Sequence, residues 1–440
     1  MSLNYLVNPG YGLKGEVCIP GDKSISHRSI IIGALAQGVT EVVNLLEGED
    51  VLSTIKAMRA LGVRIEAPKE GLLKIHGVGF NGLNSPKAPL DLGNSGTSMR
   101  LLSGVLAGQN FDSRLFGDDS LMARPMGRVI HPLKLMGASL RGEKGDYPPI
   151  FITGNKTLKG IQYDMPVASA QVKSALLLAG LFIDGEITVI EPGPTRDHTE
   201  RMLVGFGSSI SRARNKISLR GGGKLVGRPI EVPADLSSAA FFLVGAAITP
   251  NSDILLKHVG INPTRTGILK ILELMGANFQ ILNHREVSGE PVGDIRIKYS
   301  KLRGIEIPSE LVPLAIDEFP VIFIAAACAE GCTKLSGAAE LRVKESDRIN
   351  SMAIGLDTLG VKNKVMDDGI VISGGVIKGG KVNSFDDHRI AMAFAIAGSV
   401  ATGPIEISNC QNIATSFPNF CEAAMNIGMD VVTKVNSSEV

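Results

Sequence analysis

The chain has 440 residues, of which 44% are hydrophobic, and its 45 basic residues nearly balance 44 acidic ones. At roughly 100–200 residues per domain, this length predicts two or three domains with large buried cores. The near-neutral charge argues against a general nucleic-acid-binding protein, which would show a strong basic excess.

The N-terminal residues, the apolar runs and the cysteines exclude further classes. Residues 1–10 lack a basic segment followed by an apolar stretch. Apolar runs stop at about a dozen residues, fewer than the roughly 18 of a membrane span. We therefore expect a cytoplasmic chain without a membrane segment. The five cysteines are odd in number and spread out, which predicts no disulfide framework, and the apolar run around Cys328 and Cys332 predicts buried thiols, with no zinc site.

A pattern recurs six times along the chain: a short polar segment leads into a run of small and apolar residues. The Ser, Asp and Asn residues at these starts are typical N-cap residues, and the apolar bodies predict buried helices. The segments are residues 21–38, 93–108, 167–180, 232–247, 315–331 and 384–398. The steps between the anchors Ser24, Ser95, Ser169, Ser237, Asp317 and Asp386 are 71, 74, 68, 80 and 69 residues.

Strand-like runs lie between these segments and are bounded by Gly, Pro, Asn and Asp. They include residues 72–78, 114–118, 150–154, 187–193, 216–220, 253–260, 295–300 and 370–374. A period near 70 is too long for a solenoid repeat of about 20–50 residues. It favours six small α/β units, three in each of two domains, with a boundary around 225–240. The alternative is six unrelated core helices, which would not explain why the polar leader recurs with the apolar body.

The six helix starts and their flanks are rich in polar and charged residues. Helix N-termini attract anions through free N–H groups and partial positive charge, so several starts facing one cleft would form an anion site. These residues are Lys23, Ser24, His27, Arg28, Asn94, Ser95, Gly96, Thr97, Arg100, Arg124, Ser169, Gln171, Lys173, Arg196, Asp317, Glu318, Lys344, Glu345, Arg348, Asp386, Asp387, His388 and Arg389.

Four of these stretches resemble signatures of the 5-enolpyruvylshikimate-3-phosphate synthases. They are PGDKSISHR (20–28), GNSGTSMRL (93–101), RVKESDRI (342–349) and DDHRIAMAF (386–394), while TRDHTE (195–200) and IATSFP (413–418) resemble the class II branch. The similarity runs almost end to end. It implies an α/β fold of two domains, each built from three pseudo-symmetric units of helices and sheet as an inside-out α/β barrel. Residues 21–240 would form one domain, residues 1–20 with 241–440 the other, and the active site would lie in the cleft between them.

The resemblance implies transfer of the enolpyruvyl group of phosphoenolpyruvate to the 5-hydroxyl of shikimate-3-phosphate, by addition and then elimination of phosphate. Each substrate carries one phosphate and one carboxylate, groups that Arg and Lys bind well. The implied phosphoenolpyruvate ligands are Lys23, Asn94, Gly96, Arg124, Gln171, Arg348 and Arg389. The implied shikimate-3-phosphate ligands are Lys23, Ser24, Arg28, Ser169, Ala170, Gln171, Arg196, Asp317 and Lys344.

The same resemblance implies the catalytic groups. Asp317 would act as the general base and Glu345 as the general acid, with Lys23 sharing proton transfer. No metal or other cofactor is expected. Glyphosate would occupy the phosphoenolpyruvate site close to Gly96, and we expect a monomer that binds neither nucleic acid nor membrane. Thr415 and Glu340 depart from class I, which has a phosphate-binding Lys and an acceptor-binding Asn there.

Sequence features also bear on three alternative functions and on a possible metal site. The enolpyruvyl transferase acting on UDP-N-acetylglucosamine typically uses a loop Cys as acid, and residues 110–125 contain none. An RNA-processing enzyme of related fold would need stacking aromatics, yet aromatics are 5% with no Trp. An inactive anion-binding protein would not need Asp317 and Glu345. We interpret Asp197, His198 and Glu200 as a helix start rather than a metal triad, and His27 as a packing or capping residue. His388 could serve catalysis or orient Asp387.

Overall fold

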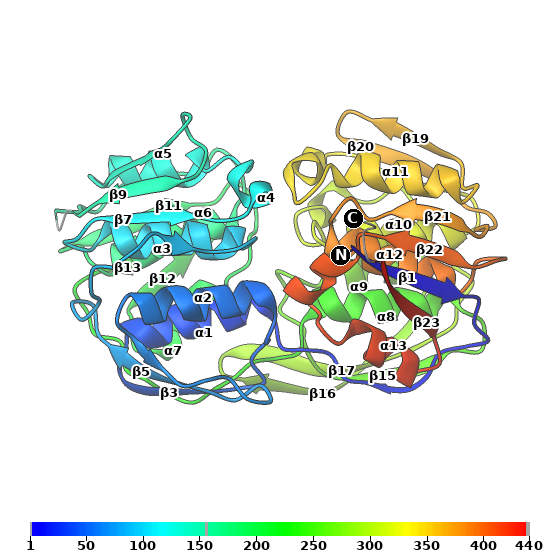
Figure 1. The fold of residues 1–440 in the computed structure, drawn as a ribbon, viewed down its shortest axis with the longest axis horizontal. Helices are drawn as coiled ribbons and strands as arrows, with labels where there is room; N and C mark the ends of the chain where they lie inside the picture. Colours follow the sequence, from blue (N-terminus) through cyan, green and yellow to red (C-terminus); the bar gives the residue numbers. More distant parts are fainter. Residues whose placement is uncertain (1, 155–156, 437–440) are drawn as a thin grey trace. The chain divides into compact units, whose positions relative to one another are not determined.

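A computed structural model describes residues 2–154 and 157–436. The chain forms two compact units (Figure 1): unit 1 comprises Met1–Pro20, Pro233–Arg285 and Pro291–Val440, and unit 2 comprises Gly21–Val232 and Glu286–Glu290. The chain passes from unit 2 back to unit 1 between Val232 and Pro233, before the expected boundary at 240/241. A division at 240/241 would cut through a buried helix, α8 (Leu236–Ile248).

Unit 2 contains three four-stranded sheets that share one topology. In each sheet the first two strands pair in parallel, and the remaining pairs are antiparallel. The first sheet has the order β14 (Ile230–Glu231), β3 (Gln37–Val43), β5 (Leu73–Val78), β4 (Arg64–Ile65). The second has β6 (Leu90–Asp91), β7 (Ser113–Phe116), β9 (Ile150–Thr153), β8 (Ser139–Gly142). The third has β10 (Gln162–Asp164), β11 (Glu186–Ile190), β13 (Lys216–Arg220), β12 (Ile210–Ala213).

Three buried helices fill the core of unit 2, and they are the first three predicted segments. They are α1 (Lys23–Leu35), α3 (Gly96–Ala107) and α6 (Ala170–Gly180). Their bodies are apolar on nearly every side, so they are stable only where other elements surround them. The strands show the complementary pattern, since residues of β3 and β8 alternate between exposed and buried. The remaining helices of the unit are α2 (Glu49–Ala60), α4 (Asp119–Met122), α5 (Gly127–Leu135) and α7 (His198–Gly205).

Unit 1 repeats the arrangement with its own hydrophobic core. Its first sheet has the order β21 (Gly380–Asn383), β22 (Ile405–Ser408), β1 (Ser2–Asn8), β23 (Asp430–Asn436). Its second has β16 (Asn278–Val287), β17 (Glu290–Lys298), β15 (Asp253–Gly260), β2 (Lys14–Val17). Its third has β18 (Cys332–Leu335), β20 (Gly369–Ser373), β19 (Asn363–Met366). Parallel pairing recurs at β21–β22 and β2–β15, and two isolated parallel bridges lie beside β18.

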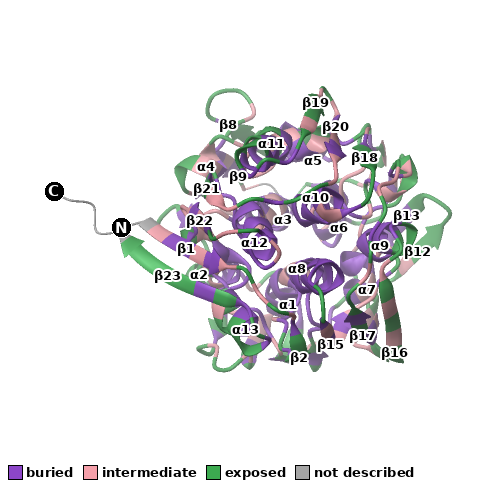
Figure 2. Cartoon of the chain, turned by 90° about the vertical axis from the view of Figure 1, so that its right-hand side faces the viewer, coloured by how far each residue is buried: buried purple, intermediate pink, exposed green. Residues whose placement is uncertain are grey.

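The core helices of unit 1 are the other three predicted segments. They are α8, α10 (Phe319–Cys328) and α12 (His388–Gly398), which are coloured as buried along nearly their whole length in Figure 2. The remaining helices are α9 (Gly267–Leu274), α11 (Arg348–Thr358), α13 (Phe420–Asn426) and the short 3₁₀ turns η1 (Ser309–Leu311), η2 (Ala339–Val343) and η3 (Gln411–Thr415). The predicted α/β fold class, with three helix-and-sheet repeats per unit, is thus confirmed. In the part of the chain that the structure describes, no helix has the length and apolar character to cross a membrane.

Two local predictions need correction. Asp386 and Asp387 are both expected as N-cap residues, but only Asp387 caps α12, because its side chain accepts from the Arg389 N–H, whereas Asp386 has a positive φ of 55°. Cys332 is exposed on β18, although the neighbouring apolar run predicted a buried thiol. Strand alternation turns Cys332 outward. Burial raises the pKa of the Cys328 thiol to about 12.

Candidate active site

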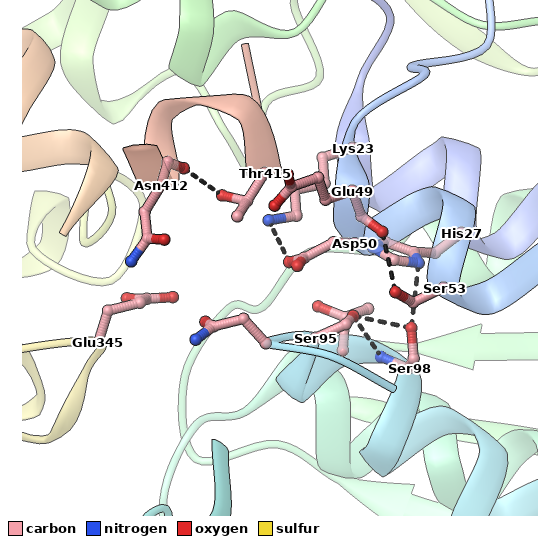
Figure 3. Close-up of polar contacts among 12 residues, drawn as sticks. Lys23, His27, Glu49, Asp50, Ser53, Ser95, Ser98, Glu345, Asn412 and Thr415 are labelled. Carbon is pink, nitrogen blue, oxygen red and sulfur yellow. Dashed lines mark hydrogen bonds and ion pairs between the residues drawn. The ribbon is translucent and has the colours of Figure 1, made fainter. Parts of the chain in front are cut away.

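Lys23 begins α1 and is paired with a carboxylate of α2. Its Nζ lies 2.5 Å from Oδ2 of Asp50 (Figure 3), whose side chain is only 8% exposed. The neighbouring His27 bonds to Thr54 at 2.7 Å and to Ser98 at 3.3 Å. Burial is the main cause that lowers the pKa of His27 well below its ordinary value, so this ring stays neutral and acts in packing. The pair with Asp50 fixes where the Lys23 ammonium points.

The start of α3 holds three of the expected phosphoenolpyruvate ligands together. Ser95 caps the helix by accepting from the Ser98 N–H, so that Gly96 is its first residue. Arg124 donates through Nη2 to Oδ1 of Asn94 at 2.6 Å. A Cβ built on Gly96 would lie 3.4 Å from Nη1 of Arg124. Asn94, Gly96 and Arg124 therefore form one polar surface at a helix N-terminus, a natural anion site.

Gln171 of α6 is locked to α3 by two hydrogen bonds. Its Oε1 accepts from Arg100 Nη1 at 2.6 Å, and its Nε2 donates to Thr97 Oγ1 at 2.9 Å. The capping residue of α6, Ser169, accepts from the Val172 N–H. These bonds bring the expected ligands Ser169, Ala170 and Gln171 next to the start of α3. Arg100 was not among the predicted site residues.

Arg28 is a buried cation held by three separate elements. It donates to the Ser24 carbonyl at 2.9 Å, to Ser174 Oγ at 2.8 Å and to Thr199 Oγ1 at 2.6 Å. Burial lowers its pKa to about 10, with Arg196 adding to the shift and Glu200 opposing it. The guanidinium therefore stays charged near neutral pH.

The TRDHTE segment forms the start of α7, as predicted. Asp197 is the residue before the helix, and its Oδ1 accepts from Arg201 at 2.9 Å. His198 Nδ1 bonds to Glu290 at 2.7 Å in a buried pair. Asp197, His198 and Glu200 therefore have separate partners, and within residues 2–154 and 157–436 no group of three His, Cys, Asp or Glu side chains is arranged to hold a metal ion.

In unit 1, three expected site residues gather around a fourth, Arg348. Arg348 is 1% exposed and donates to Glu345 at 2.6 Å and to Asp387 at 2.8 Å. Asp317 lies 3.6 Å from Arg348 and 3.4 Å from the Lys344 ammonium. Burial opposes the charge on Arg348, but Asp387, Glu345 and Asp317 outweigh it and raise the pKa of Arg348. The expected base, the expected acid and two expected ligand cations thus form one cluster.

Arg389 belongs to a neighbouring cluster at the starts of α8, α10 and α12. Its Nη1 lies 3.9 Å from Oε1 of Glu318, a carboxylate that is buried and accepts from Ser237 Oγ. Ser237 also accepts from Arg265 at 2.6 Å. Glu318 therefore links Arg389 to Ser237 of α8.

The two departures from class I also have defined places. Thr415 ends the turn η3 and bonds to the Asn412 carbonyl at 2.7 Å (Figure 3). Glu340 lies in η2, 4.0 Å from the Lys344 ammonium. Neither residue supplies a cation.

Comparison with known proteins decides the family. The family model of EPSP synthase (3-phosphoshikimate 1-carboxyvinyltransferase) matches residues 7–424. The chain belongs to the EPSP synthase family. It is 60% identical over 427 residues to the 3-phosphoshikimate 1-carboxyvinyltransferase of Methylococcus capsulatus, covering 97% of this chain and 98% of the relative. The corresponding protein of Nitrosococcus oceani is 58% identical over 98% of this chain and 97% of its own length.

A solved structure agrees with this assignment. The EPSP synthase of Acinetobacter baumannii superposes with a TM-score of 0.89 at 54% sequence identity, over 99% of this chain and 100% of that one. The predicted family and the predicted fold are therefore confirmed. The individual roles of the site residues stay predictions.

Proposed function

We propose that the chain transfers the enolpyruvyl group of phosphoenolpyruvate to the 5-hydroxyl of shikimate-3-phosphate and releases phosphate, a step of aromatic amino acid biosynthesis. One observation carries the proposal. Relatives that are 55–60% identical over nearly the whole chain are 3-phosphoshikimate 1-carboxyvinyltransferases. In this chain, the residues that resemble the family's signatures lie at helix starts.

The phosphoenolpyruvate phosphate binds at the starts of α1, α3 and α6, through Lys23, Asn94, Gly96, Arg124 and Gln171. Arg348 and Arg389 bind its carboxylate. The contacts of Arg348 support this role, because its Nη1 is buried and makes no hydrogen bond to any residue that the structure describes. A bidentate carboxylate would satisfy that donor.

Shikimate-3-phosphate binds to Lys23, Ser24, Arg28, Ser169, Ala170, Gln171 and Arg196, while Asp317 and Lys344 meet its hydroxyls. Three of the five N–H donors of Arg28 already bond to protein, which orients the guanidinium and leaves two donors for an anion. The residues proposed for each substrate belong to both units, so catalysis requires both.

Asp317 removes the proton of the 5-hydroxyl of shikimate-3-phosphate while the hydroxyl oxygen bonds to C2 of phosphoenolpyruvate. Glu345 protonates C3. The tetrahedral adduct then loses a proton from C3 as its bond to phosphate breaks. Lys23 shares proton transfer, and the surrounding cations stabilise the developing charge. Glu345 must first be separated from Arg348, which it contacts at 2.6 Å. A substrate carboxylate bound by Arg348 would provide that separation.

The test is phosphate release from phosphoenolpyruvate in the presence of shikimate-3-phosphate, of UDP-N-acetylglucosamine or of no acceptor. We expect release with shikimate-3-phosphate alone. Release with the nucleotide sugar instead would establish the sister enolpyruvyl transferase activity, and no release with either acceptor would refute enolpyruvyl transfer.

Three further expectations complete the proposal. Glyphosate should compete with phosphoenolpyruvate, the enzyme should act as a monomer in the cytoplasm, and it should not require nucleic acid or a membrane. Competition kinetics and sedimentation of the purified chain check the first two directly.

A further inference from the structure

Lys173 is a fully buried cation whose role no substrate contact explains. It lies on α6, two residues after Gln171, and its side chain is 0% exposed. Its Nζ lies 2.8 Å from Oε1 of Glu191 and 2.5 Å from Oε1 of Glu200. A charge is costly to bury unless it is paired, so these three side chains form one unit, here called the Lys173 triad.

The Lys173 triad joins α6, which begins beside the proposed ligands Ser169 and Gln171, to the end of β11 and to α7, the elements on either side of Arg196. Glu191 follows β11 directly and also accepts from Thr195 Oγ1. Glu200 lies on α7, one residue after Thr199. Arg196 lies between the two carboxylates in sequence, and Ser169 begins the helix that carries Lys173. The ion pairs therefore tie the start of α6 to both sides of Arg196.

The triad also borders Arg28. Thr199 accepts from Arg28 Nε at 2.6 Å and bonds to Ser174 at 2.6 Å, and Ser174 accepts from Arg28 Nη2. The triad places two carboxylates and one ammonium near this cation, and Arg212 lies 3.5 Å from Glu191. Burial raises the pKa of Glu200, and the Lys173 ammonium opposes that shift. Glu200 is the largest opposing influence on the lowered pKa of Arg28. The carboxylates thus support a charged Arg28 without competing for its two remaining donors.

We propose that Lys173, Glu191 and Glu200 are positioning residues that set the shikimate-3-phosphate site by holding Arg28, Arg196 and the start of α6 in register. This inference rests on the proposed function. It predicts a selective loss of shikimate-3-phosphate affinity when the ion pairs are removed, because displacement of binding groups by about 1 Å can cost on the order of 100-fold. Among the phosphoenolpyruvate ligands, Gln171 also lies on α6, but its two hydrogen bonds to α3 hold it in place. The phosphoenolpyruvate site should therefore be affected far less.

The decisive variant replaces the whole triad by neutral groups of similar shape, Lys173→Met with Glu191→Gln and Glu200→Gln. Neutral replacement removes the three buried charges of the triad together, and such exchanges are often neutral for stability. Shikimate-3-phosphate binding is measured by calorimetry without phosphoenolpyruvate, and the KM for phosphoenolpyruvate is measured at saturating shikimate-3-phosphate. We expect the Kd for shikimate-3-phosphate to rise about 10–100-fold and the KM for phosphoenolpyruvate to change by less than about threefold.

A folded triple variant that binds shikimate-3-phosphate like wild type would overturn the proposal, as would an equal loss for both substrates. If the triple variant does not fold, Thr199→Val decides, because it separates the triad from Arg28 and leaves the ion pairs intact. It should show the same selective loss, and normal binding would again overturn the proposal. Lys270→Met, which breaks the exposed Lys270–Glu273 pair of 3.1 Å, is the matched control and should change neither constant. Wild-type chain that binds no shikimate-3-phosphate would refute the proposed function, whereas wild-type binding with an unchanged variant would refute only the positioning role.

Discussion

Replacing Gly96 by Ala is the most informative single change at the proposed phosphoenolpyruvate site. The new Cβ would lie 2.8 Å from Nη1 of Arg100 and 3.4 Å from Nη1 of Arg124. The Arg100 guanidinium must therefore move by roughly 0.6 Å to reach the 3.4 Å at which ordinary contacts begin. Arg100 is not free to do so without consequence, because the same Nη1 donates to Gln171 at 2.6 Å.

The magnitude follows from two effects. Overpacking typically costs about 1–3 kcal/mol. The methyl group also narrows the space beside the backbone, and glyphosate is longer than phosphoenolpyruvate, so most of that penalty should act on the inhibitor. At 1.4 kcal/mol per decade, glyphosate affinity should fall by about 5–150-fold. Phosphoenolpyruvate should lose less, and shikimate-3-phosphate should be nearly unchanged.

The assay is the glyphosate inhibition constant and the KM for phosphoenolpyruvate, measured for wild type and for Gly96→Ala. Gly223→Ala is the control, because a Cβ there meets no atom within 4 Å. In an Arg100→Lys background the penalty of Gly96→Ala should shrink if the Arg100 contact is its source. Equal losses for inhibitor and substrate, or no loss for either, would show that Gly96 does not lie beside the donor site.

Three further predictions test the chemistry, the buried histidine and the division of the site. Asp317→Asn should keep most shikimate-3-phosphate binding and lose turnover by about 10²–10⁴-fold, and near-normal turnover would remove Asp317 from the mechanism. Because burial lowers the pKa of His27, the neutral ring contributes stability at neutral pH that is lost on acidification below about pH 6.5, its ordinary pKa. Between pH 7.5 and 5, wild type should therefore lose more apparent unfolding free energy in urea than His27→Asn, and parallel losses would contradict a buried neutral ring. Shikimate-3-phosphate should change the small-angle scattering of the chain, because its proposed ligands belong to two units, and identical profiles would contradict closure.

The sequence predicts those helices and strands that have a recognisable pattern within their own residues. The six core helices were predicted because an N-cap residue precedes a long apolar body, and strands such as β5, β15 and β20 because β-branched runs end at Gly or Asn. The two-residue strands β4, β6 and β14 have no such signal, since only pairing with a neighbour defines them. The association of residues 286–290 with unit 2 is likewise invisible in sequence, because it depends on contacts such as that between Glu290 and His198.

In the candidate site, some residues are likewise predicted from sequence motifs, whereas others are found only through their contacts in the structure. Proposed ligands such as Lys23, Gly96 and Arg389 are predicted from short motifs that resemble family signatures, and these motifs lie at helix starts, where anions bind well. Their supporting residues are defined by proximity in space, so Arg100 and Lys173 were recognised as polar residues of the helix starts without any role. A signal was nevertheless present. Both are charged residues within the first two turns of otherwise apolar, buried helices, where a cation is rarely found unless it is paired. Such a residue predicts a buried partner, and in this chain those partners, Gln171 for Arg100 and two carboxylates for Lys173, connect one helix start to the next.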